Sequence, residues 1–251
     1  MGHNPVATQE LVRVDSVAVD RAVTMATHSH DRDQITLVIE GSLQVETSEG
    51  TWTVPSGEVV WVPHGVEHAE RLHAGASLRL LHLDAGIGEG LPQRCHTLVA
   101  TPLLRELILR VGELGGLDAS VPEQARLAGV LLDEVRSQDE APLKLPTPQD
   151  PRALQFARMV DEAPADRTSV SELARRAGTS RRTMERLFMA DLGMSIGEWR
   201  HRLRLHQALR LLGEQHPVNE VARRSGYGSA SAFITAFKRQ FGVTPNRYRP
   251  Q

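Results

Sequence analysis

An internal repeat in the C-terminal half of the chain constrains its fold more than any other sequence feature. The first copy begins Leu173-Ala-Arg-Arg-Ala-Gly178 and the second begins Val221-Ala-Arg-Arg-Ser-Gly226. The copies lie 48 residues apart up to the glycine (226 − 178) and 49 apart from Ser180 and Ser229 onward (229 − 180). The shared residue types continue to Trp199-Arg200 in the first copy and Tyr248-Arg249 in the second. This register predicts two copies of one supersecondary unit, with one extra residue in the second turn.

Each copy has the residue pattern of a helix, a tight turn and a second helix. In the first copy, Gly178 suits a left-handed helix end, and Ser180 suits the N-cap of the next helix. A small residue, Ala174, allows the two helices to cross closely. Met184 and Phe188 then form an apolar stripe and leave arginines on the outer face. The pattern predicts two helix-turn-helix units, and a plain helical bundle is the alternative that this exposed cationic helix argues against.

The segment between the two copies predicts a rigid connecting helix. Residues 199–212 place apolar side chains at helical periodicity and arginines at most other positions. Successive major grooves on one face of B-DNA are about 34 Å apart. A rigid connector of the right length therefore lets one chain engage two grooves.

Charge divides the 251-residue chain near a proline-rich stretch, and this length suits two domains. Residues 1–145 carry 11 Lys and Arg against 21 Asp and Glu, a net charge of −10, whereas residues 146–251 carry 18 against 10, a net charge of +8. A basic segment behind a linker is typical of a nucleic-acid binder. Opposite charges also predict that the two halves dock and compete with DNA phosphates.

The second copy carries a recognisable signature. Val221 to Arg249, which contains GYGSASAFITAFKRQFGVTPNRYR, resembles the signature of the AraC/XylS family of bacterial transcription regulators. The resemblance covers about residues 150–250. It implies binding to double-stranded operator or promoter DNA, and contact with RNA polymerase if the protein is an activator.

The same resemblance implies which side chains contact DNA. Family residues that match Arg182, Glu185 and Arg186 face bases, and so do three in the second unit. Those three are Ala230, Ser231 and Thr235. Bidentate purine readout needs Arg, Lys, Asn or Gln, so we expect the first unit to carry most of the sequence specificity and the second to hold phosphates. The full expected set is Ser180, Arg181, Arg182, Glu185, Arg186, Ser229, Ser231, Thr235, Lys238 and Arg239.

From about residue 6 to 84, short alternating segments are broken by glycine turns. The turn glycines Gly41, Gly50, Gly57 and Gly65 are spaced by 9, 7 and 8 residues. This spacing predicts an antiparallel sandwich or barrel. The clearest strands are 35–39, 42–47, 51–54 and 58–62. Two amphipathic helices with proline at the start, 102–114 and 122–135, follow; they either cap the barrel or form a homodimer interface, which the family resemblance favours.

Three histidines have the spacing of a binding site inside this barrel. The patterns are His28-x-His30-x3-Gln34-x6-Gly41 and Gly57-x5-Pro63-x-Gly65-x2-His68, which resemble the two cupin motifs. Two residues apart on a strand, His28 and His30 point to one side, and the turn can return His68 opposite them. Three imidazoles and the Gln34 oxygen suit Zn²⁺, Ni²⁺, Mn²⁺ or Fe²⁺. Gln34 stands where metal-binding cupins have a glutamate, so metal affinity is weakened and a carboxylate base is missing; a metal-free pocket for an organic effector is the alternative.

Other aromatic residues of the barrel have less specific roles. Trp52 and Trp61 lie on predicted strands and suit the core, although a pocket-facing tryptophan would suit an aromatic effector. His64 lies in the turn, and His73 and His82 fall outside the motif, so these three are expected to be ordinary surface or strand histidines.

These observations predict a multidomain α+β protein. The expected parts are a cupin-like β-barrel sensor (1–98), a helical segment (99–140), a linker (141–150) and an all-α DNA-binding domain (151–251). The expected function is transcription regulation under control of a small molecule or a metal. A metal-dependent cupin enzyme is disfavoured by Gln34, and a non-specific DNA protein would not need a barrel. The single cysteine excludes an internal disulfide, and without an apolar run of about 18 residues a cytoplasmic location without membrane contact is expected.

Overall fold

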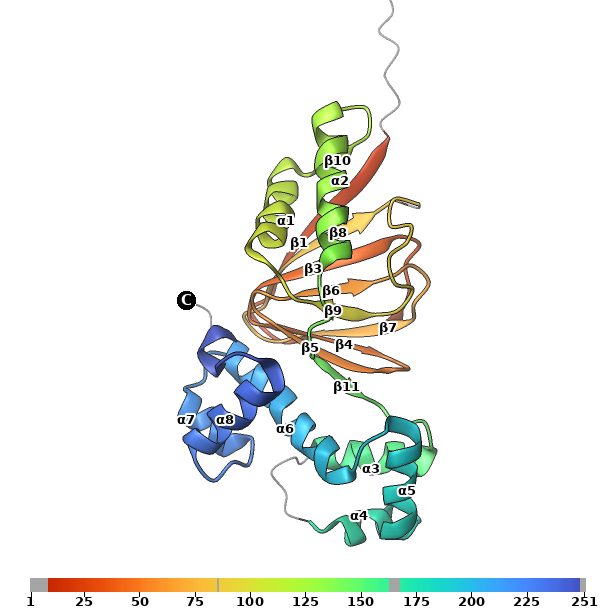
Figure 1. Ribbon diagram of the computed structural model, residues 1–251, viewed down its shortest axis with the longest axis vertical. Helices are drawn as coiled ribbons and strands as arrows, with labels where there is room; N and C mark the ends of the chain where they lie inside the picture. The colour runs from red at the N-terminus through yellow and green to blue at the C-terminus, as the bar shows by residue number, and fades with distance from the viewer. Residues whose placement is uncertain (1–8, 85, 163–167, 249–251) are drawn as a thin grey trace, which may run out of the picture.

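A computed structural model describes residues 9–84, 86–162 and 168–248, which form a β domain stacked on a helical domain (Figure 1). The predicted order, an antiparallel β domain followed by helix-turn-helix units, is confirmed. Residues 6–8 of the predicted barrel and Arg249 of the repeat lie outside the described residues.

Two antiparallel sheets make the β domain. The six-stranded sheet has the order β10-β1-β8-β3-β6-β9, and the five-stranded sheet has the order β11-β5-β4-β7-β2. The strands are β1 (Glu10–Ala18), β2 (Val23–His28), β3 (Asp33–Glu40), β4 (Ser42–Thr47), β5 (Gly50–Pro55), β6 (Val59–Val62), β7 (His68–Leu72), β8 (Ser77–Leu83), β9 (His96–Leu98), β10 (Gly116–Asp118) and β11 (Lys144–Pro146). Apolar side chains of both sheets, including Val38, Val60, Leu43 and Leu72, share one core between the sheets.

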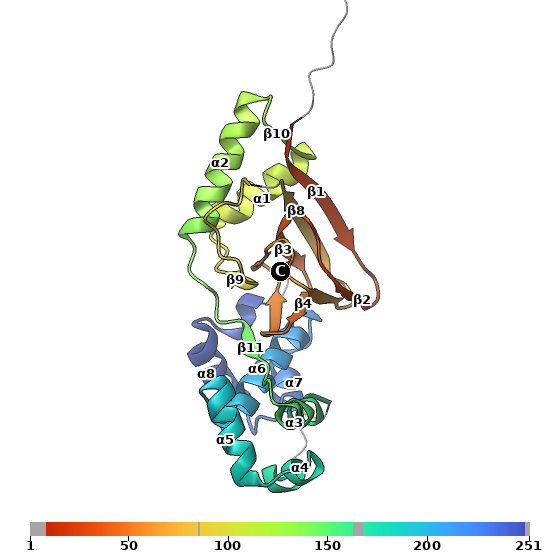
Figure 2. The same cartoon turned by 90° about the vertical axis from the view of Figure 1, so that its right-hand side faces the viewer.

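Two helices cover the outer face of the larger sheet, as Figure 2 shows from the side. They are α1 (Pro102–Leu114) and α2 (Pro122–Ser137), and both begin with proline as predicted. Leu104 and Ile108 of α1 join Ile35 of β3 in a second core. Side chains of β3 that point to opposite faces of the sheet therefore pack into two different cores.

The helical domain has a separate core for each half of the repeat. Its elements are α3 (Pro151–Glu162), α4 (Val170–Arg176), α5 (Arg181–Leu192), α6 (Ile196–Gly213), α7 (Val218–Arg224), α8 (Ala230–Phe241) and the 3-10 turn η1 (Pro245–Tyr248). Trp199 and Leu203 of α6 belong to the first core, and Leu209 and Leu212 belong to the second. One continuous helix thus joins both units, which confirms the predicted connector.

The segment predicted as a linker is ordered over part of its length. β11 pairs with β5 in the smaller sheet, while Leu143 and Leu145 are buried in the two helical cores. The Pro146 carbonyl also accepts a hydrogen bond from Trp199 Nε1 at 2.9 Å. The period-2 spacing of Ala141, Leu143 and Leu145 was the strand signal in this proline-rich stretch.

Both barrel tryptophans are core residues. Trp52 and Trp61 are fully buried, and Trp61 Nε1 donates to the Pro92 carbonyl at 2.8 Å. Neither indole therefore presents a free face to a ligand. The expectation that one of these tryptophans could face a pocket for an aromatic effector is wrong. The core role has the plain physical reason that each indole fills space among aliphatic side chains.

Candidate nucleic-acid interface and effector site

The turns of the two helix-turn-helix units have matching hydrogen bonds. Gly178 and Gly226 adopt left-handed φ values of 74° and 79°. Thr179 N donates to Ala174 O at 2.9 Å, and Tyr227 N donates to Ala222 O at the same distance. The extra residue of the second copy is accommodated after this bond, so both units turn in the same way.

Ser180 and Ser229 are the N-caps of α5 and α8. Ser180 Oγ accepts a hydrogen bond from Thr183 N at 3.2 Å, and Ser229 Oγ accepts one from Ala232 N at 3.1 Å. Both serines are exposed. Their oxygens fix the start of each helix, which satisfies backbone N–H groups that would otherwise lack partners.

Helix α5 presents two arginines without intramolecular partners. Arg182 and Arg186 are exposed, and neither forms a hydrogen bond or ion pair with the residues that the structure describes. Arg181 Nε instead donates to Glu185 Oε1 at 2.8 Å. Of the three α5 residues expected to face bases, Arg182 and Arg186 therefore present cations that are unpaired among the described residues, whereas Glu185 is paired with Arg181.

Helix α8 distributes its side chains differently from α5. With the offset of 49, Ser231 corresponds to Arg182 and Thr235 to Arg186, whereas the cations Lys238 and Arg239 come one turn later. All four of these α8 residues are exposed. The first turns of a reading helix lie nearest the base edges. Arg182 and Arg186 thus lie in the first two turns of α5, whereas Lys238 and Arg239 lie in the last turn of α8.

The barrel histidines lie together as predicted. His28 and His68 are directly opposite each other in the β2–β7 pairing, with ring centroids 4.4 Å apart. His30 lies 5.0 Å from His68 by the same measure. Strand pairing and the turn before β7 thus bring the two motifs into one cluster.

The rings pack against one another and do not converge on a single point. The Nδ1 atoms of His28 and His68 lie 2.9 Å from the carbonyls of Ala26 and Val66. Within residues 9–84, 86–162 and 168–248, no group of three or more His, Cys, Asp or Glu side chains is placed to hold a metal ion. As they are placed in this structure, the histidines do not fit a metal ion. Metal binding by His28, His30, Gln34 and His68 stays a prediction.

The cluster contains a carboxylate that the sequence analysis missed. Glu70 is buried on β7 and lies 4.0 Å from His68 Nε2. Gln34 Nε2 donates hydrogen bonds to Glu70 Oε1 at 3.3 Å and to Thr36 Oγ1 at 3.0 Å. The amide nitrogen of Gln34, and not its oxygen, therefore faces Glu70. The signal was the spacing of Glu70 two residues after His68, which places both on one face of a strand.

His82 also joins the cluster, although it was expected to be an ordinary strand histidine. Its ring centroid lies 6.4 Å from that of His30, and its Nε2 lies 3.0 Å from Asp15 Oδ2. β8 pairs His82 opposite Gln34, which explains its position. His64, by contrast, is an exposed turn residue that contacts Asp33 at 2.8 Å.

Burial shifts the pKa of two groups in this cluster toward the neutral form of each. Burial, with the nearby His68, lowers the pKa of His30 to about 4, and burial raises the pKa of the Glu70 carboxyl. Neither nitrogen of His30 has a hydrogen-bond partner in the described part of the chain, nor has His68 Nε2. Unpaired buried polar atoms are rare in proteins. The cluster is therefore able to receive the polar groups of a ligand.

Comparisons with known proteins agree with both domains. A family model described as an AraC-like ligand binding domain matches residues 19–174, and one described as a helix-turn-helix domain matches residues 173–251. The chain is 34% identical over 226 residues to the HTH-type transcriptional regulator NimR of Escherichia coli, covering 90% of this chain and 82% of that protein. It is 29% identical over 209 residues to RipA of Corynebacterium diphtheriae, covering 83% of this chain and 58% of the relative.

Solved structures also match. The DNA-binding domain of AdpA, in complex with a target DNA, is 37% identical over 40% of this chain and 91% of that chain, with a TM-score of 0.36. ToxT from Vibrio cholerae is 11% identical over 95% of this chain and 98% of that chain, with a TM-score of 0.40. Within the described residues, no helix has the length and apolar character needed to cross a membrane.

Proposed function

The chain belongs to the AraC family of transcriptional regulators, and from this premise we propose that a small organic molecule, bound among the barrel histidines, controls its binding to a specific DNA site. The protein is a regulator and not an enzyme. The observation that carries the effector proposal is the set of buried imidazole nitrogens without partners on His30 and His68. A DNA target implies that the protein acts in the cytoplasm.

The chemistry of the cluster defines the class of effector. A neutral imidazole offers one N–H donor and one acceptor, and a buried carboxyl with a raised pKa is a further donor when it is protonated. Such a site favours an uncharged molecule with hydroxyl, carbonyl or ring-nitrogen groups over an anion. Val38, Val60 and Leu72 belong to the apolar core between the two sheets of the same barrel.

On the DNA side, α5 reads bases and α8 holds phosphates. The unpaired Arg182 and Arg186 support this assignment, as do the small residues at the matching positions of α8. α6 spans 18 residues, so its axis is about 27 Å long, which suits two reading helices on neighbouring grooves.

We further propose that the regulator acts as a homodimer through α1 and α2. Leu103 and Val130 on these helices are 51% and 48% exposed, which leaves apolar side chains on the outer surface. A second copy of the same surface would cover them in an isologous interface. Contact with RNA polymerase applies if the protein activates transcription.

The effector is tested by denaturing purified protein and identifying what it releases by mass spectrometry, with elemental analysis in parallel. We expect an organic molecule that is lost from a His30→Ala variant and retained by His64→Ala, the matched turn control. A stoichiometric metal that disappears in a His28→Ala/His30→Ala double variant would replace the organic ligand by Zn²⁺, Ni²⁺, Mn²⁺ or Fe²⁺. Release of neither, together with DNA binding that no cell extract changes, would contradict the effector proposal.

The DNA assignment is tested separately by selecting bound sequences from a random duplex library. We expect one recurring sequence for the wild type and relaxed selection for Arg182→Ala. A wild type that enriches no sequence would contradict specific recognition.

A further inference from the structure

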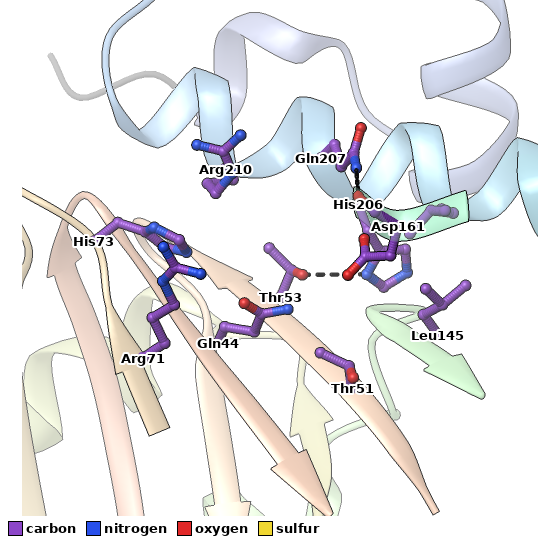
Figure 3. Close-up of a pocket in the computed structure, with 11 residues that line it drawn as sticks. Gln44, Thr51, Thr53, Arg71, His73, Leu145, Asp161, His206, Gln207 and Arg210 are labelled. Atoms are coloured by element: carbon purple, nitrogen blue, oxygen red, sulfur yellow. Dashed lines mark hydrogen bonds between the residues drawn. The ribbon is translucent and has the colours of Figure 1, made fainter. Parts of the chain in front are cut away.

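A cavity lies between the two domains, outside the barrel. Its volume is about 290 Å³, near the lower end of the range typical of small-molecule sites. One wall is the outer face of the smaller sheet and the other is α6, with the end of α3 beside it (Figure 3). Polar side chains dominate the lining: Gln44, Thr51, Thr53, Arg71, Asp161 and Gln207.

Two arginines reach this cavity from opposite walls. Arg71 comes from β7 and Arg210 comes from α6. Arg210 Nη1 donates to Glu214 Oε1 at 2.8 Å. Arg71 forms no hydrogen bond or ion pair with any residue that the structure describes. Asp161 is the one acidic residue among the lining side chains. Burial raises the pKa of the Asp161 carboxyl, and the charges of Arg210 and Arg71 act in the opposite direction. Arg71 thus has an acidic neighbour in the cavity but no ion pair with it.

Two buried histidines on the same lining have nitrogens without partners. His73 and His206 are each only 4% exposed, and the Nε2 atom of each has no hydrogen-bond partner among the described residues. The other nitrogen of His206 lies 3.3 Å from Thr53 Oγ1, which fixes its ring across the domain boundary. His73 Nδ1 lies 3.9 Å from Glu214 Oε1. Each of these two lining rings therefore has one buried nitrogen without a partner among the described residues.

Both of these histidines are neutral at pH 7. Burial, with the neighbouring Arg210, lowers the pKa of His73 to about 4, and burial, with Arg202, lowers the pKa of His206 to about 3. They act as hydrogen-bonding groups and not as charges. The cationic character of the cavity therefore comes from the arginines, and the histidines add directional polar contacts.

We propose that this cavity binds a small organic acid that touches both domains at once. Its carboxylate pairs with Arg71 and Arg210, and its hydroxyl or second carboxylate oxygen bonds the Nε2 atoms of His73 and His206. Arginine suits this role because its planar fork binds carboxylate oxygens in pairs. A ligand held by both walls stabilises the docked arrangement in proportion to its greater affinity for that arrangement. This site goes beyond the barrel effector proposed above and does not depend on it.

Isothermal titration of the full-length protein with citrate, succinate and inorganic phosphate tests the proposal. We expect saturable millimolar or tighter binding of at least one of the two carboxylates. Arg71→Ala and Arg210→Ala are each expected to weaken it about tenfold, the effect of losing one charge-assisted contact. Arg13→Ala is the matched control, because Arg13 is an exposed strand arginine on β1 in the other sheet. Circular dichroism checks that each variant is folded.

Three results would overturn the proposal. One is the absence of saturable binding by the wild type, which would leave a solvent-filled cavity. Another is equal binding by the wild type and both pocket variants, and the third is binding of phosphate alone, which would identify an inorganic anion site. No DNA or barrel ligand enters this titration, so its failure is distinguishable from failure of the proposed function.

Discussion

Gly213, at the end of α6, lies directly against the carbonyl oxygen of Gly41 in the turn between β3 and β4. A β carbon at position 213 would be 2.7 Å from Gly41 O and 3.1 Å from Ser42 Cβ. Such a distance to backbone is not tolerated without a shift, so glycine permits the approach of the two domains. Close packing thus complements the ion pair between Arg247 and Glu58, 3.4 Å apart, in holding the domains together.

We predict that Gly213→Ala destabilises the domain contact. The added methyl group forces α6 away from the β3–β4 turn at an expected cost of about 1–3 kcal/mol, more than the helix propensity gained. Gly129→Ala on α2 is the control, because a β carbon there meets nothing within 4 Å. Thermal unfolding of both variants is the measurement. If Gly213→Ala is as stable as Gly129→Ala, the domains do not dock in this way.

Docking leaves the residues that we expect to contact DNA accessible. Arg182 and Arg186 of α5, and Lys238 and Arg239 of α8, are exposed while α6 packs on the sheet. The opposite net charges predicted docking in competition with DNA, but the docked barrel does not cover these side chains. Any competition would therefore act through the electric field of the acidic domain and not through steric overlap.

We predict that the two reading helices differ in what they recognise. Arg182→Ala or Arg186→Ala should cost about 1–3 kcal/mol at the selected site and little on scrambled duplex. Lys238→Ala should weaken both duplexes alike and reduce the slope of log affinity against log salt by about 1. Titrations at several salt concentrations separate the two patterns. Equal losses on both duplexes for the α5 variants would assign those arginines to phosphates.

A further prediction separates capping from DNA contact at Ser180. Ser180→Ala removes the cap of α5 and should lower stability by about 1 kcal/mol, whereas Ser180→Asp retains a capping oxygen. The added carboxylate should nevertheless weaken DNA binding, because it faces the phosphates that α5 approaches. Chemical denaturation and DNA titration of both variants check this. Undiminished DNA binding by a stable Ser180→Asp protein would mean that this cap lies away from the phosphates.

The helix-turn-helix units were predictable because their information is local. Turn glycines and capping serines act within a few residues, so a repeat of 48 to 49 positions was enough to identify them. The strand at Lys144–Pro146 was missed because proline composition outweighed a short alternation. Its pairing with β5 joins residues almost a hundred positions apart, and such contacts leave little trace in one sequence.

The histidine cluster of the barrel was predictable only in part for the same reason. The spacing of His28, His30 and His68 resembles the two cupin motifs, and this resemblance predicted that the three rings lie close together, as they do. Glu70 and His82 join them through strand register, which no motif specified. The domain contact involving His73 and His206 depends on how two folded units meet, and neither residue carried a sequence signal for it.

The last prediction concerns pH and the buried His206. Its pKa falls from an ordinary 6.5 to about 3 in the folded protein because burial disfavours the charged ring. Between these values the unfolded chain binds more protons than the folded chain, so the free energy of unfolding decreases as pH falls. This contribution is complete above pH 6.5 and should fall by about 2 kcal/mol between pH 7 and pH 5. His73, whose pKa is about 4, acts in the same direction. We expect thermal unfolding of His206→Gln to depend less on pH over this range, and that of a His206→Gln/His73→Gln double variant less again. A wild-type pH dependence that persists in both variants would show that neither ring is buried and neutral at the domain contact in solution.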